Sequence, residues 1–115
     1  MKIIVDAFGG DNAPLEILKG CAQAVAEYGL EILLTGPEEE IRRVAKEHEI
    51  SLDHMEIAHA PQIITMEDHA GEVLKSKKDS SMAEGLRRLA AGEGDAFISA
   101  GNSGALVEMC IRDRL

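Results

Sequence analysis

Two glycine-rich stretches of the sequence combine residue types that suit the binding of an anion. The first, Asp6-Ala7-Phe8-Gly9-Gly10-Asp11-Asn12-Ala13-Pro14, places two carboxylates around adjacent glycines. The second, Ser99-Ala100-Gly101-Asn102-Ser103-Gly104, offers an amide and hydroxyl groups beside two glycines. Glycine lets a ligand approach the main chain, and the free N–H groups that begin a helix attract negative charge. A turn that needs glycine only for its geometry explains the first stretch about as well.

A third stretch, Lys77-Lys78-Asp79-Ser80-Ser81-Met82, supplies ammonium and hydroxyl groups. Together with backbone N–H groups, these side chains suit a phosphate. Each feature also has a simpler explanation, since Lys75, Lys77 and Lys78 could form a solvated cluster and Ser80-Ser81 a helix cap. The stretch remains a candidate because it precedes the helix that leads to the second glycine turn.

Alternating strands and helices are predicted to position these stretches. The apolar, β-branched run at 3–6 is typical of a strand buried on both faces, and Pro14 suits the first turn of a helix. Further strands are expected at 31–36, 55–58 and 95–100. Helices are expected at 15–28, 38–48 and about 81–91, with a short one near 71–75 and another from about 103. This order predicts an α/β fold with a mostly parallel sheet and flanking helices.

In open parallel sheets, ligands bind beyond the carboxyl ends of the strands. The turns Phe8–Asn12 and Ala100–Gly104 both follow a predicted strand and precede a predicted helix. We therefore expect both turns at the same edge of the sheet, where their N–H groups would hold a phosphate.

The composition narrows the classes of function. The net charge of −9, with no Trp and one Tyr, lacks the basic field and stacking rings that nucleic-acid binding needs. No apolar run reaches the roughly 20 residues of a membrane span, and a strand that starts almost at once leaves no room for a signal peptide. We therefore expect a cytoplasmic protein. Cys21 and Cys110 predict no disulfide framework, and Cys21 lies in the apolar stripe of a helix, where packing is expected.

Other motifs for cofactors and metals are absent from the sequence. Neither GxGxxG nor GxxxxGK[ST] occurs, which argues against a dinucleotide fingerprint and a P-loop. His48, His54, His59 and His69 lack the spacing of a metal set. His69 could carry a proton, although a solvent-exposed loop histidine is the commoner case. We expect neither a metal nor a cofactor.

The three stretches, in this order, resemble one family. Up to about Val107, the chain is similar to the N-terminal part of the bacterial phosphate acyltransferase of phospholipid synthesis. Phe8 stands where methionine is usual and Ser103 where threonine is usual, and neither difference changes the charge. Family members are roughly three times this length, so residues 1–107 are interpreted as the N-terminal part of an α/β domain. Residues 108–115 are interpreted as a non-native tail, because Met109–Leu115 resembles the adapter-derived end of translated metagenomic sequences.

The resemblance implies a fold similar to isocitrate and isopropylmalate dehydrogenases, here truncated. It implies transfer of a fatty acyl group from acyl carrier protein to inorganic phosphate, which gives an acyl phosphate. A membrane acyltransferase would then use that product. Family members are similar in being cytoplasmic homodimers that associate with the inner membrane surface.

A hypothesis for the site follows from this reaction. Four glycines would shape a backbone cradle, four polar side chains would donate hydrogen bonds, a lysine would offset charge, and a carboxylate would orient a donor or take a proton. These are Gly9, Gly10, Gly101 and Gly104; Asn102, Ser103, Ser80 and Ser81; Lys78; and Asp6 or Asp11. A structural cap or turn role for the two aspartates is nearly as well supported.

Alternative functions stay open at this stage. A phosphotransacetylase-like enzyme would use coenzyme A thioesters, and a Rossmann-like module would bind an anion or nucleotide without catalysis. Acyl carrier proteins are acidic, as is this chain, so long-range attraction is absent and docking would need a local basic patch such as Arg87-Arg88 or Lys75–Lys78. A truncated chain could also be inert by itself.

Overall fold

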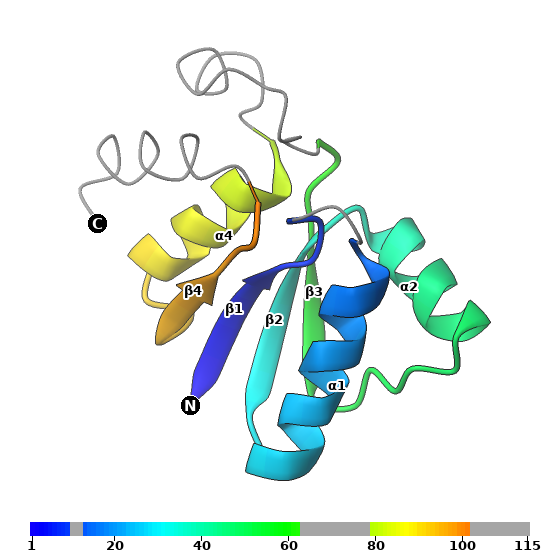
Figure 1. The fold of residues 1–115 in the computed structure, drawn as a ribbon. Coiled ribbons are helices and arrows are strands. Elements are labelled where there is room, and N and C mark those ends of the chain that lie inside the picture. The colour runs from blue at the N-terminus through cyan, green and yellow to red at the C-terminus, as the bar shows by residue number, and fades with distance from the viewer. Residues whose placement is uncertain (10–12, 63–78, 102–115) are drawn as a thin grey trace.

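The described part of the chain folds into a four-stranded sheet covered by helices on both faces (Figure 1). The computed structural model describes residues 1–9, 13–62 and 79–101. In chain order, the described elements are β1 (Lys2–Asp6), α1 (Leu15–Tyr28), β2 (Glu31–Gly36), α2 (Glu38–Glu47), β3 (Met55–His59), α4 (Ser81–Ala90) and β4 (Ala96–Ile98). Among these elements, no helix is long and apolar enough to cross a membrane.

The strands run in the order β3-β2-β1-β4, and every neighbouring pair is parallel. β1 is central, with Ile4 paired to Leu33 of β2 on one side and to Phe97 of β4 on the other. The prediction of an α/β fold with a mostly parallel sheet is therefore confirmed. Because the strands are parallel, their carboxyl ends meet at one edge of the sheet.

Alternating side chains divide the core into two layers. Ile3 and Val5 of β1 face α1 and α2, where they pack with Leu18 and Ile41. Ile4 faces α4 on the opposite side, together with an apolar residue from each of the other three strands, Leu33, Ala58 and Phe97. Figure 1 shows α1 and α2 in front of the sheet and α4 on the other side. A parallel sheet buried on both faces requires such nearly continuous apolar strands.

Local sequence signals explain where the helices begin and end. Gly29 ends α1 with φ of +64°, a left-handed conformation that glycine adopts without a Cβ clash. α2 carries Glu38, Glu39 and Glu40 in its first turn and Lys46 in its last, as the helix dipole favours. These two predicted helices and their boundaries are confirmed to within one residue.

Several predicted boundaries need correction. Pro14 is the N-cap of α1, so it lies just before the first helical residue. β4 covers only Ala96–Ile98 instead of 95–100. Before its start the N–H of Lys2 bonds to the side chain of Asp95, and beyond its end the side chain of Ser99 bonds to Asp6. β3 extends one residue further than predicted, to His59. The helices expected near 71–75 and from about 103 lie outside the described residues.

Candidate active site

The turn after β1 meets the turn after β4 at the carboxyl edge of the sheet. A Cβ placed on Gly9 would lie 2.8 Å from the backbone N of Gly101 and 2.8 Å from Ser99 Oγ. A Cβ on Gly101 would lie 3.3 Å from Gly9 Cα. Main chain therefore approaches main chain here, and no larger residue than glycine fits at Gly9 without displacing the neighbouring turn.

Asp6, at the end of β1, is buried beneath this contact and only 3% exposed. Its Oδ1 accepts a hydrogen bond from the backbone N–H of Phe8 at 3.0 Å, and its Oδ2 accepts one from Ser99 Oγ at 3.0 Å. The Ser81 side chain also bonds to this carboxyl. Burial raises the pKa of Asp6 above the ordinary value of 3.8, and the three hydrogen bonds oppose that shift. Asp6 thus ties β1, β4 and α4 together.

Ser99 links this carboxylate to the second turn. Its Oγ donates to Asp6 and accepts a hydrogen bond from the backbone N–H of Gly101 at 3.1 Å. The Gly101 N–H is therefore bonded within the protein, to Ser99. The contribution of Gly101 to the site is that its main chain can lie close to that of Gly9.

The two serines at the start of α4 are buried and have partners within the protein. Ser80, which is fully buried, is the N-cap, and its Oγ accepts from the backbone N–H of Ala83 at 3.1 Å. Ser81 bonds to Asp6 through its side chain, and its carbonyl accepts from Thr35 Oγ1 at 2.7 Å. The cap interpretation of Ser80 is confirmed, whereas donation from either serine to a ligand stays a prediction.

The described residues include five members of the predicted site, namely Asp6, Gly9, Ser80, Ser81 and Gly101, all at this one edge. The other six predicted site residues lie outside the described ranges. They are Gly10, Asp11, Lys78, Asn102, Ser103 and Gly104. His69 and Cys110, considered for other roles, lie outside as well.

The sequence interpretation missed two residues of this network, Ser99 and Thr35. Thr35 is fully buried and pairs with Asp6 in the register of β1 and β2. The available signal was its place at the end of an apolar strand, level with the carboxylate of the neighbouring strand. A polar residue that is buried at such a position must find a hydrogen-bond partner.

Other chemically capable side chains serve packing or lie at the surface. Burial raises the pKa of the Cys21 thiol to about 11, so the residue is a packing group, as predicted, and a poor nucleophile. His48, His54 and His59 are exposed, and His59 Nδ1 accepts from the backbone N–H of Glu38 at 3.1 Å. Within the described part of the chain, no group of three or more His, Cys, Asp or Glu side chains could hold a metal ion.

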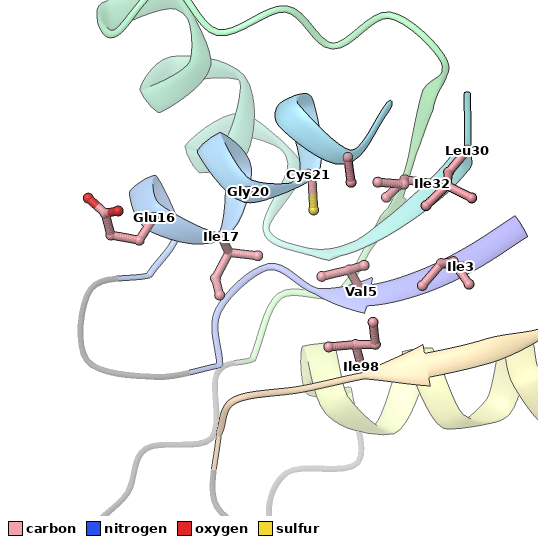
Figure 2. A pocket seen from close by; sticks show the side chains of 10 residues that line it. Ile3, Val5, Glu16, Ile17, Gly20, Cys21, Leu30, Ile32 and Ile98 are labelled. Atoms are coloured by element: carbon pink, nitrogen blue, oxygen red, sulfur yellow. The ribbon is translucent and has the colours of Figure 1, made fainter. Parts of the chain in front are cut away.

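An apolar groove of about 270 Å³ lies on the face of the sheet opposite α4 (Figure 2). Ile3 and Val5 of β1, Ile17 and Cys21 of α1, and Ile98 of β4 line it. Glu16 is its one charged lining residue, and Figure 2 shows its carboxylate directed away from the apolar side chains. This lining does not suit phosphate, so the polar edge remains the candidate anion site.

Comparison with known proteins identifies the family. The family described as "Fatty acid synthesis protein" matches residues 1–112. The chain is 48% identical over 108 residues to the phosphate acyltransferase of Acetivibrio thermocellus, and 46% identical over 109 residues to that of Chlorobaculum parvum. Each alignment covers 93% of this chain and 32% of the relative, so the chain spans about a third of the length of these curated relatives. The chain therefore belongs to the fatty acid synthesis protein family whose similar members are named phosphate acyltransferases.

Proposed function

We propose that this chain forms part of an enzyme that transfers a fatty acyl group from acyl carrier protein to inorganic phosphate. The product would be an acyl phosphate for phospholipid synthesis. The approach of Gly9 to Gly101 carries this proposal, because it places two of the three motifs shared with the family at one edge of the sheet. The similarity to phosphate acyltransferases supports it independently.

The proposed chemistry needs positioning more than a strong base. Phosphate is partly dianionic at neutral pH, since its second pKa is about 6–7. One phosphate oxygen attacks the thioester carbonyl, the carbon–sulfur bond breaks, and the carrier protein leaves as a thiolate that takes up a proton. The protein must hold both reactants together and stabilise the oxyanion that forms at the carbonyl.

Each predicted site residue then has a defined task. Gly9 and Gly101, with Gly10 and Gly104, shape the cradle by allowing main chain to approach main chain. Asn102, Ser103 and Lys78 donate hydrogen bonds and positive charge to the phosphate or the oxyanion. Asp11 takes a proton or orients a donor. Asp6, which is buried under the turns that follow β1 and β4, orients both of them, in keeping with its three internal hydrogen bonds.

Wider features of the family complete the proposal. We assign the whole protein a fold like that of isocitrate and isopropylmalate dehydrogenases, a homodimeric state, and a cytoplasmic location at the inner membrane surface beside a membrane acyltransferase. Carrier-protein docking needs exposed positive charge. Arg87 and Arg88 are both paired with Glu84, so Lys75–Lys78 is the better candidate patch.

A hybrid enzyme tests the proposal with the residues of this chain. It consists of residues 1–107 of this chain followed by the C-terminal remainder of the Acetivibrio thermocellus relative. The assay measures acyl phosphate formed and carrier-protein thiol released from acyl carrier protein and inorganic phosphate. We expect the hybrid enzyme to be active, and Asn102→Ala, Ser103→Ala and Lys78→Ala each to reduce acyl phosphate formation by roughly tenfold or more.

Lys46→Ala, in the last turn of α2, is the matched control for the loss of a lysine, and it should leave turnover unchanged. Full turnover in all three site variants would refute the residue assignments. Faster transfer from acyl coenzyme A than from acyl carrier protein would favour the phosphotransacetylase-like alternative. Phosphate binding in calorimetry without any transfer would favour a non-catalytic module.

A further inference from the structure

Ser99 occupies a position between the buried carboxylate and the second glycine turn. It is the first residue after β4, and its Oγ lies 3.0 Å from Asp6 Oδ2 and 3.1 Å from the backbone N of Gly101. A hydroxyl group has one hydrogen to donate and lone pairs to accept with. Ser99 uses both capacities here, so the bonds run in one direction from the Gly101 N–H through the hydroxyl to the carboxylate.

The far end of this chain of bonds is firmly anchored. Asp6 accepts from its own turn through Phe8, from β4 through Ser99, and from α4 through Ser81. Every one of these donors is neutral, and none of the described residues brings a charged side chain to the carboxylate. Ser81, the first residue of α4, is itself held in place, because Thr35 Oγ1 donates to its carbonyl at 2.7 Å.

The position of Ser99 matters because Gly9 and Gly101 lie in close contact beside its hydroxyl group. Gly9 has no side chain, and a Cβ there would lie 2.8 Å from Ser99 Oγ and 2.8 Å from the backbone N of Gly101. The distance between the two turns therefore depends on where the Ser99 hydroxyl holds the Gly101 peptide. Displacement of a binding group by about 1 Å can lower the rate of an enzyme a hundredfold.

We propose that Ser99 is a positioning residue, whose hydroxyl joins the Asp6 carboxylate to the Gly101 N–H and so holds the β4 turn in register with Gly9. Its effect on catalysis rests on the proposed phosphate acyltransferase function, whereas its effect on the geometry of the turn does not. Two separate measurements therefore test it.

The first measurement uses this chain and requires no substrate. NMR follows hydrogen exchange of the Gly101 N–H and titration of the Asp6 carboxyl in the chain, in Ser99→Ala and in Ser99→Thr. Ser99→Ala should speed exchange at Gly101 by at least roughly tenfold and raise the pKa of Asp6, because the hydrogen bond from Ser99 lowers that pKa. Ser99→Thr, which keeps the hydroxyl, should restore both. Ser51→Ala is the control, since Ser51 is an exposed serine that accepts from the N–H of Asp53.

The second measurement uses the hybrid enzyme. Ser99→Ala should raise KM for phosphate by about tenfold while kcat and KM for the acyl donor change less than twofold, and Ser99→Thr should recover most of the loss. A variant that merely unfolds part of the enzyme would lower kcat and leave both KM values unchanged. Ser99→Cys, which nearly keeps the side-chain volume, should show the same selective loss even if Ser99→Ala does not fold.

The outcomes separate the two proposals. Unchanged Gly101 exchange and Asp6 titration in Ser99→Ala would overturn the positioning role, as would unchanged kcat/KM for phosphate in every Ser99 variant of an active hybrid enzyme. If the hybrid enzyme with Ser99 intact makes no acyl phosphate, the proposed function fails, and the exchange and titration data still decide the role of Ser99.

Discussion

Gly9 follows β1 and Gly36 is the last residue of the neighbouring strand β2. Both lie at the same edge of the sheet and neither has room for a Cβ, yet their surroundings differ. At Gly9 the obstacle is the main chain of the β4 turn, 2.8 Å away at the N of Gly101. At Gly36 an added Cβ would clash with the ring of Phe8, and φ of +150° adds backbone strain for any other residue. One glycine thus permits two backbones to meet, and the other permits an aromatic ring to pack.

We propose that this difference separates a ligand-binding part of the carboxyl edge from a structural one. The β1–β4 end holds a buried carboxylate and glycines in backbone contact. The β2–β3 end is closed by protein groups, since the N–H of Ala60 donates to the carbonyl of Gly36 at 2.9 Å and the N–H of Glu38 to His59. We therefore expect substitution of Gly9 to affect ligand binding and catalysis, and substitution of Gly36 to affect packing and stability.

The largest expected effect is that of Gly9→Ala in the hybrid enzyme. Its Cβ meets backbone, which cannot rotate away, so the β4 turn must move. We expect roughly a hundredfold loss of acyl transfer and a loss of about 1–3 kcal/mol in the free energy of unfolding. Enzyme assay and denaturant unfolding measure the two effects. Transfer within threefold of the unsubstituted hybrid enzyme would show that the contact between the turns has no catalytic role.

Gly36→Ala should show the opposite balance. We expect a loss of about 1–3 kcal/mol in stability from overpacking against Phe8, with transfer by the folded hybrid enzyme kept within threefold. Phe8→Leu in the same molecule should recover part of the stability, because leucine lacks the ring Cε2 that the new Cβ meets and its side chain can adjust more easily than the ring. The comparison breaks if Gly36→Ala lowers the activity of folded enzyme as much as Gly9→Ala.

Thr35→Val should have a smaller effect, confined to stability. Thr35 is fully buried and donates to the carbonyl of Ser81, so the valine removes one buried hydrogen bond without changing the shape much. A loss of about 1–2 kcal/mol is expected from denaturant unfolding of this chain. Thr35→Ser, which keeps the donor, is the control and should lose less. No loss in Thr35→Val, or a larger loss in Thr35→Ser than in Thr35→Val, would mean that the methyl group, and not the hydrogen bond, is responsible.

The smallest expected effect is a dependence on pH. The pKa of Asp6 is raised above 3.8 in the folded chain, so the folded state holds this proton more tightly than the unfolded state does. Between 3.8 and the raised value, the contribution of Asp6 to stability therefore falls as pH rises. The free energy of unfolding of the chain minus that of Asp6→Asn should decrease across this window in denaturant unfolding at several pH values. A flat or rising difference would contradict the cause assigned to the shift.

The sequence predicted the elements better than the network that joins them. Helix ends with strong local signals, such as Gly29, and the alternation of strands with helices led to the correct fold class. The bonds among Asp6, Thr35, Ser81 and Ser99 could not be predicted, because they join four segments and depend on strand register.

The central claim is that phosphate binds where the turns of Gly9 and Gly101 meet. Its most direct test is NMR titration of this chain with inorganic phosphate, with the backbone N–H resonance of Gly36 as the internal reference. The N–H resonances of Gly9 and Gly101 should shift together and saturate with one affinity while Gly36 stays in place. No shift at either glycine, or an equal shift at Gly36, would contradict the claim.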